Sequence, residues 1–140
     1  MSKDYGDMYQ YILESKKAGR NIISNHEEIF HDAVEYFLEG DYAQIYVIGS
    51  GPSYHYALDD KRLMEKVLKM KVFASYPIVF KDEQIFNKKT LVMGLSHAGM
   101  SASTIAGLDK AKECGFGTIA MTAERGRPVE HHGDVKLYVE

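Results

Sequence analysis

This 140-residue chain has little of what defines several large classes of protein. Its single cysteine, Cys114, excludes an internal disulfide, and no apolar run approaches the roughly 18 residues that cross a bilayer. The first ten residues contain no apolar core of a signal peptide. Acidic and basic residues are mixed and give a formal net charge of −3, so the chain has no basic stripe for nucleic acid. We therefore expect a cytoplasmic protein with neither a membrane nor a nucleic acid as its partner.

Proline is also scarce, and the first one is Pro52, so the leading residues are free to form helices. Apolar residues recur there at helical spacing and predict two helices, Asp4–Ala18 and Ile22–Leu38. Gly19 lies between them, and Gly40 is the expected stop. We expect residues 1–40 to form a helical pair packed on the domain that residues 41–140 form.

From Ala43 onward, short apolar runs alternate with helical stretches. The runs are rich in β-branched residues and read QIYVIG, KVFAS, TLVMGLS, GTIAMT and VKLYVE. Strands that alternate with helices predict a parallel sheet covered on both faces, since each crossover places a helix on the sheet. The expected fold class is α/β, a three-layer αβα sandwich whose five strands follow the flavodoxin-like order 2-1-3-4-5. The last run, VKLYVE, has no following helix to cover it, as in a fragment of a longer protein.

Two of the expected strands end in turns rich in glycine and serine. The first is GSGPS, Gly49–Ser53, and the second is SHAGMSAST, Ser96–Thr104. Each turn opens a helix, where free backbone N–H groups and the positive end of the helix dipole suit an anion. In an open α/β sheet such turns meet where the strand order reverses, so the pair predicts an anion site.

The commoner nucleotide and metal motifs do not fit. Gly49 and Gly51 begin a dinucleotide fingerprint, but Tyr54 stands at the third glycine position, and the strand KVFAS ends without an acid. No Gly-Lys-Ser/Thr triplet of a P-loop occurs. His131 and His132 have only Glu130 close by, which favours a solvated turn over a metal site. We expect no cofactor and no metal.

The two turns together resemble a known family. The segment IGSGPSYHYA, then LSHAGMSAST some forty residues later, then AKECGFGTIAMTA and a short D-V-K-L strand, is similar to the sugar isomerase (SIS) domain. The resemblance covers about residues 44–140. Within the family the chain looks most like the first of two tandem domains, as in the isomerase half of glucosamine-6-phosphate synthase and in fructosamine-6-phosphate deglycases.

The resemblance implies where a phosphate would bind. By position, the family's phosphate cradle falls on Ser53 of the first turn and on Ser96, His97 and Ser101 of the second. Gly51 and Gly99 are the glycines that let the backbone approach the ligand closely.

Two residues depart from the family's pattern, in which the second turn reads S-x-S-G-x-[ST]-x-[DE]-[ST]. Ala98 replaces a serine, and Met100 replaces a polar residue. One lost hydrogen bond of this kind costs on the order of 1 kcal/mol. The plainer interpretation of Ser53 and Ser101 is that they cap helices, and an exposed loop residue is the alternative for His97.

The implied function is binding of a phosphorylated sugar by an isomerase or deglycase of amino sugars or fructosamine phosphates. The catalytic residues are unknown, because the family's glutamate base lies beyond the first domain. A phosphosugar-sensing domain of a regulator and a non-catalytic SIS module are the alternatives. The family also implies a homodimer, and tyrosines of the first segment, Tyr9 and Tyr11 among them, are candidates for core or dimer contact.

Overall fold

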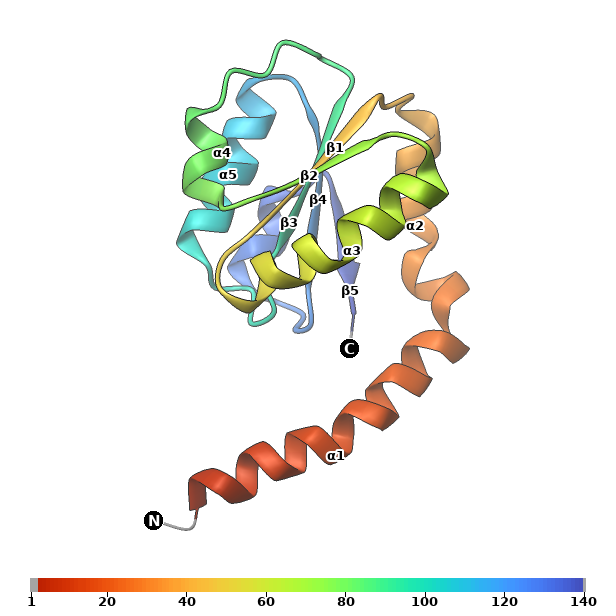
Figure 1. Cartoon of the computed structure of the whole chain (residues 1–140), viewed down its shortest axis with the longest axis vertical. Helices are drawn as coiled ribbons and strands as arrows, with labels where there is room; N and C mark the ends of the chain where they lie inside the picture. Colours follow the sequence, from red (N-terminus) through yellow and green to blue (C-terminus); the bar gives the residue numbers. More distant parts are fainter. Residues whose placement is uncertain (1–2, 140) are drawn as a thin grey trace.

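Five parallel strands form one sheet at the centre of the computed structural model, which describes residues 3–139 (Figure 1). The sheet order is β2-β1-β3-β4-β5. The strands are β1 Gln44–Gly49, β2 Lys71–Ser75, β3 Thr90–Leu95, β4 Gly117–Thr122 and β5 Val135–Tyr138. The strand order and the all-parallel pairing that the sequence predicts are both confirmed.

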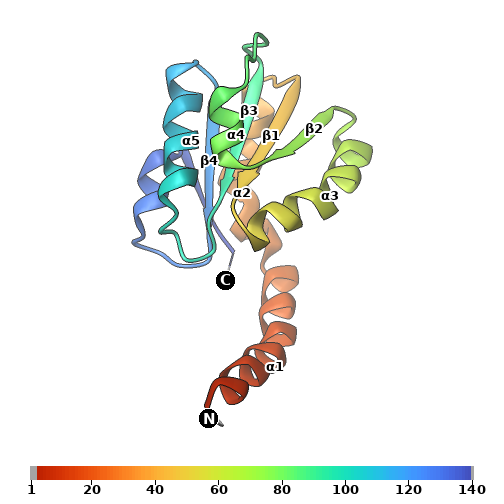
Figure 2. The same ribbon diagram turned by 60° about the vertical axis from the view of Figure 1, so that its left-hand side comes forward.

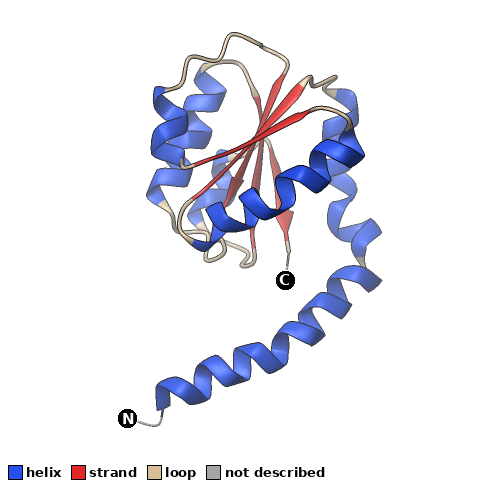
Figure 3. Cartoon of the chain, in the orientation of Figure 1, coloured by secondary structure: helices blue, strands red, loops and turns tan. Residues whose placement is uncertain are grey.

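Helices cover both faces of the sheet and complete three layers (Figure 3). They are α1 Lys3–Ser24, α2 His26–Glu39, α3 Pro52–Leu68, α4 Pro77–Asp82 and α5 Ala102–Glu113, with a 3₁₀ helix, η1, at Pro128–His132. Helix α3 packs on β1 and β2, and α2 packs on β5. On the other face α5 packs on β3 and β4, α4 packs on α5, and η1 packs on β4. None of the described helices is long and apolar enough to span a membrane.

Alternation along the strands divides the core between these two faces. In β1, Tyr46 and Ile48 point into the cluster under α4 and α5, whereas Ile45 and Val47 point into the cluster under α2 and α3. Successive side chains of a strand face opposite sides of the sheet, and both sides here are covered, so β1 is apolar from Ile45 to Ile48. This is the continuous apolar pattern of a central parallel strand.

The two leading helices that the sequence predicts are confirmed, but the break between them lies later in the chain than Gly19. Helix α1 continues through Gly19 to Ser24, and the break falls at Asn25 instead. Figures 1 and 2 show α1 leading away from the domain, while α2 alone packs on the sheet. A single glycine costs about 1 kcal/mol in a helix relative to alanine, which is too little to end one when the flanking residues favour the helix.

The last strand is better covered than the sequence alone predicts. Helix α2 packs on β5, and Leu137 is only 2% exposed. The covering element comes from the start of the chain, 98 residues before its contact: the Tyr36 hydroxyl donates a hydrogen bond to Asp134 Oδ2 at 2.7 Å. Burial and the hydrogen bonds with Tyr42 and Asp134 raise the pKa of Tyr36, so this phenol stays protonated.

Leu108 and Leu38 provide a matched test of the core under α5. Leu108 is fully buried and packs against Gly94, whereas Leu38 of α2 is 71% exposed. We expect Leu108→Ala to lower the free energy of unfolding by about 2–5 kcal/mol and Leu38→Ala to change it by less than about 0.5 kcal/mol. Denaturant melts measure both, and equal losses would contradict this assignment of the core.

Candidate functional site

The turns that follow β1 and β3 lie side by side because these two strands pair in register. Ile48 pairs with Gly94 and Gly49 with Leu95, so both strands end at the same level of the sheet. Helix α3 then leaves toward one face of the sheet and α5 toward the other. The point between β1 and β3 is therefore the topological switch point, where ligands bind in open α/β sheets.

Gly51 gives the first turn its shape. Its φ is +56° and its ψ is −127°, a conformation that L-residues rarely adopt. A Cβ built there would have no heavy atom within 4 Å among the described residues, so the space beside Gly51 is open. Pro52 occupies the first turn of α3 and supplies no N–H, and the amide of Ser53 donates to Ser50 O at 3.2 Å. The Ser53 side chain lines a cavity and does not cap α3.

Hydroxyl groups join the two turns. Ser50 Oγ lies 3.0 Å from Ser103 Oγ, which lies 3.2 Å from Ser101 Oγ. Ser101 is the N-cap of α5 and accepts hydrogen bonds from Thr104 N at 3.3 Å and Thr104 Oγ1 at 3.0 Å. We call Ser50, Ser101, Ser103 and Thr104 the hydroxyl cluster. The capping interpretation of Ser101 therefore holds, and Ser101 also contacts a neighbouring hydroxyl.

Three members of this cluster are absent from the sites that the sequence predicts. Ser50, Ser103 and Thr104 lie in the two serine-rich turns, but their spacing in the sequence does not show that Ser50 meets Ser103, 53 residues later. The signal that could have found Ser103 and Thr104 is the run SAST at a helix start. Ser96, which the sequence does predict, is buried, and its Oγ accepts a weak hydrogen bond from Ser101 N at 3.4 Å.

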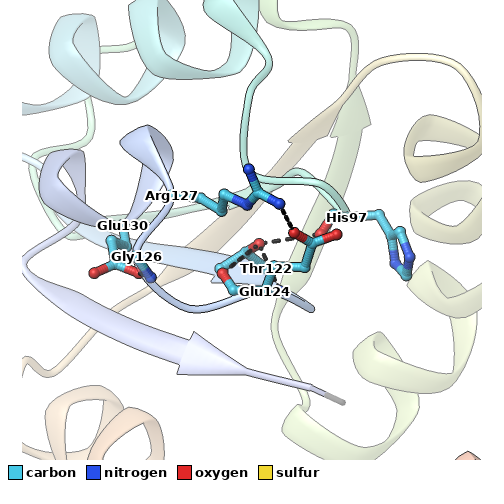
Figure 4. A network of polar contacts seen from close by, with 6 residues as sticks. All are labelled: His97, Thr122, Glu124, Gly126, Arg127 and Glu130. Atoms are coloured by element: carbon cyan, nitrogen blue, oxygen red, sulfur yellow. Dashed lines mark hydrogen bonds and ion pairs between the residues drawn. The ribbon is translucent and has the colours of Figure 1, made fainter.

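The loop after β4 holds His97 in place (Figure 4). The carbonyl of His97 accepts hydrogen bonds from Thr122 Oγ1 at 3.1 Å and from Ala123 N at 3.0 Å. Glu124 and Arg127 form an ion pair on one side of this backbone, and the imidazole points away from that pair. It lines the same cavity as Ser53 and Ser96.

Gly99 makes a close approach, but to the protein itself. Its φ is +69°, and a Cβ there would lie 2.3 Å from Arg127 Cβ and 3.0 Å from Thr122 Oγ1. Val129 N donates to the Gly99 carbonyl at 3.0 Å, so η1 is anchored to this turn. The space at Gly99 is thus filled by the loop after β4, in contrast to the open space at Gly51.

The cavity beside these residues has a volume of about 600 Å³ and two kinds of lining. Its polar end carries Ser53, Ser96, His97 and Thr122. The rest is mostly apolar and includes Val47, Tyr56, Ala57, Met64, Met93, Leu95, Met121 and Val139. Asp60 is the one carboxylate among the lining residues. The arrangement suits a ligand with an anionic group at the hydroxyl-bearing turns, because hydroxyls and amides can donate to it.

No group of three or more His, Cys, Asp or Glu side chains that could hold a metal occurs within residues 3–139. His132, one of the adjacent histidines, contacts Asp109 of α5, with Nδ1 2.7 Å from Oδ1. The contact ties η1 to α5 on the face of the sheet opposite the cavity. We assign it a structural role.

A family model matches residues 41–140, which include both turns and all five strands; it describes the SIS domain. The chain belongs to the SIS domain family. A relative from Thermoplasma volcanium, named as a probable phosphoheptose isomerase, is 32% identical, with 96% of this chain and 79% of the relative covered. The isomerizing glutamine–fructose-6-phosphate aminotransferase of Thermococcus kodakarensis is 28% identical over 94% of this chain but only 22% of its own length. The chain thus spans about a fifth of that aminotransferase.

Solved structures carry the same SIS fold. A Clostridium difficile protein with the provisional name phosphosugar isomerase matches with a TM-score of 0.79 and 26% identity, over 89% of this chain and 35% of that one. The sugar isomerase domain of an RpiR transcription factor from Sphaerobacter thermophilus matches with a TM-score of 0.67 and 20% identity, over 91% of this chain and 73% of that one. The second likeness concerns the fold alone.

Gly99→Ala should destabilise the SIS domain more than Gly115→Ala. Both glycines have positive φ, +69° and +80°, and an alanine there costs about 1–2 kcal/mol of backbone strain. Only at Gly99 would the new Cβ also collide with Arg127. Denaturant melts of the two variants measure the difference. Equal losses would mean that the loop after β4 moves aside freely and does not support the turn.

Glu130 makes the stability of the same loop depend on pH. Burial alone would raise the pKa of this carboxyl, but hydrogen bonds from the Tyr138 hydroxyl and from Gly126 N, at 2.7 Å, together with Lys136, lower it. A carboxyl whose folded pKa is lowered adds stability above its unfolded pKa of about 4.3, and that stability is lost as the pH falls below it.

Glu130→Gln should therefore unfold more easily than the parent chain at pH 7, and the difference should shrink as the pH falls toward 3. Melts at several pH values measure this. Glu39→Gln on the exposed end of α2 is the control and should show no such convergence. A constant difference between Glu130→Gln and the parent over this range would refute the assigned role of the carboxylate.

Proposed function

We propose that this SIS domain binds the phosphate of a phosphorylated sugar at the polar end of the cavity. The observation that carries the proposal is the meeting of two hydroxyl-rich turns at the N-terminus of α5, where Ser50 and Ser103 lie 3.0 Å apart beside Ser101. The N-terminus of a twelve-residue helix carries free N–H groups and a partial positive charge. Phosphate oxygens would accept hydrogen bonds from these amides and from the hydroxyls of Ser53, Ser96 and Ser101.

Gly51 and Ser53 serve the proposed site from the first turn. The open space beside Gly51 lets a phosphate approach the backbone, and a side chain there would also be strained by the φ of +56°. On the second turn, Ala98 supplies no hydroxyl, and the 57% exposed Met100 supplies no polar contact. We therefore assign the polar contacts of this turn to Ser96, His97 and Ser101. Gly99 has no side chain, which allows Arg127 to pack directly against the turn.

The ligand that we propose is an amino sugar phosphate or a fructosamine phosphate. The activity that we propose for the protein is isomerisation or deglycation of this sugar. The names of the relatives support this class, since one is an isomerizing aminotransferase that acts on fructose 6-phosphate and another an isomerase of a phosphorylated heptose. Such chemistry moves a proton between neighbouring sugar carbons and needs a general base. We assign no residue of this chain to that role, and we expect the isolated chain to bind without turnover.

Binding should depend on the phosphate. We expect heat of binding with glucosamine 6-phosphate, fructose 6-phosphate or glucose 6-phosphate and none with the parent sugars. The reason is that the hydrogen-bond donors of the proposed site, which are hydroxyls and backbone amides, suit an anion. Isothermal calorimetry on the full chain tests this. Equal heats with the phosphorylated and free sugars would remove the phosphate site from the proposal.

Two serine variants then separate binding from capping. Ser53→Ala should weaken phosphosugar binding about 10- to 150-fold, the equivalent of a charge-assisted hydrogen bond of about 1.5–3 kcal/mol, with no loss of stability. Ser101→Ala should weaken binding similarly and also lower the free energy of unfolding by about 1 kcal/mol, because Ser101 caps α5. Ser24→Ala at the end of α1 is the control and should leave both unchanged. Unaltered phosphosugar affinity in both site variants would mean that the two turns only begin helices and do not bind the phosphate.

A further inference from the structure

Helix α3 presents one line of side chains to the cavity. Ser53, Ala57, Asp60 and Met64 recur at intervals of three or four residues, which places them on one face of the helix, and all four line the cavity. This face begins at the first turn, where we propose that the phosphate binds, and continues along the apolar part of the cavity. With a rise of 1.5 Å per residue, the Cα atoms of Ser53 and Asp60 lie about 10 Å apart along the helix axis.

Asp60 gives this face of α3 a negative charge. It is the one carboxylate among the described residues that line the cavity, and no ion pair with Asp60 occurs in the part of the chain that the structure describes. The bases that follow it, Lys61 and Arg62, do not line the cavity. A carboxylate beside apolar side chains attracts a cation more strongly than a carboxylate in open water does.

Tyr56 lies one helical turn before Asp60 and also lines the cavity. Its side chain is 64% exposed, so a ligand can reach the ring. Side chains four residues apart on a helix are neighbours. An aromatic ring attracts a cation to its face, and a carboxylate accepts charge-assisted hydrogen bonds from an amine. The pair therefore has the chemistry that recognises an ammonium group.

We propose that Tyr56 and Asp60 form a subsite for the amine of a phosphorylated amino sugar, and that Asp60 makes the cavity select such a sugar over its neutral counterpart. This inference rests on the phosphate site proposed above. With the phosphate at the turns, the sugar extends along α3, and an amine on C1 or C2 lies at the end of the hexose away from a phosphate on C6. The Asp60 carboxylate also repels phosphate, so the ligand binds in one orientation.

The matched ligands are glucosamine 6-phosphate and glucose 6-phosphate, which differ only at C2. The glucose hydroxyl can donate to Asp60, but an ammonium group does so with charge assistance and attracts the carboxylate as well. Asp60 is exposed, so water screens part of this attraction. We expect the parent chain to bind glucosamine 6-phosphate about 2- to 10-fold more tightly than glucose 6-phosphate.

Asp60→Asn removes the charge and keeps the shape of the side chain. It should weaken glucosamine 6-phosphate binding about 2- to 10-fold and leave glucose 6-phosphate binding equal or slightly tighter, because a repulsion of the phosphate is lost. Asp59→Asn, the same change outside the cavity lining, is the control and should keep the parent's preference. Isothermal calorimetry on the full chain at pH 7 and low salt measures all four affinities. Equal losses for both ligands in Asp60→Asn would overturn the proposal.

Tyr56→Leu tests the ring. It should reduce the preference for glucosamine 6-phosphate, whereas Tyr9→Leu on α1, where the tyrosine is 63% exposed, should not. Circular dichroism checks that each variant is folded. A preference that Tyr56→Leu leaves intact would overturn the part assigned to the ring.

Glucose 6-phosphate has no amine, so its binding to the parent chain tests the phosphate site alone. If it binds as tightly as glucosamine 6-phosphate, the amine subsite is overturned and the phosphate site stands. If neither ligand gives heat, both are overturned.

Discussion

The pairing of β1 with β3 is the constraint on which the rest of the site depends. It aligns Gly49 with Leu95 and so brings two turns, some fifty residues apart in the chain, to one level of the sheet. Because α3 and α5 then leave toward opposite faces, the space between them stays open at the ends of the strands. The 3.0 Å contact of Ser50 with Ser103 exists only because of this alignment.

The loop after β4 contacts the turn that follows β3 and fixes its backbone. Thr122 and Ala123 hold the backbone of His97, and Arg127 fills the space beside Gly99. Glu130 in turn accepts a hydrogen bond from Gly126, so a buried carboxylate orders the loop. The result is a second turn whose backbone is fixed by the protein and a first turn whose glycine faces open space. A rigid turn opposite an open one is a sound basis for holding a small anion, because little ordering is left for the ligand to impose.

The cavity beside the proposed anion site has two kinds of lining. Its polar end belongs to the turns, and its apolar end is made of side chains that a parallel sheet normally buries under a helix. Helix α1, which leads away from the domain, also exposes apolar side chains, Ile12 and Leu13 among them.

The sequence by itself determined the α/β class, the strand order and the SIS family, because apolar periodicity and two glycine- and serine-rich turns are local signals that one chain carries openly. It also predicted Gly51, Ser53, Ser96, His97, Gly99 and Ser101 as site residues through that resemblance. Only the tertiary structure decided that Ser50 meets Ser103, that Arg127 occupies the space at Gly99, that α2 covers β5 and that α1 stands apart. The first three depend on contacts between segments that are distant in the chain, and the last depends on a helix that continues through a glycine. The spacing of residues in the sequence predicts neither the contacts nor the continuation of the helix.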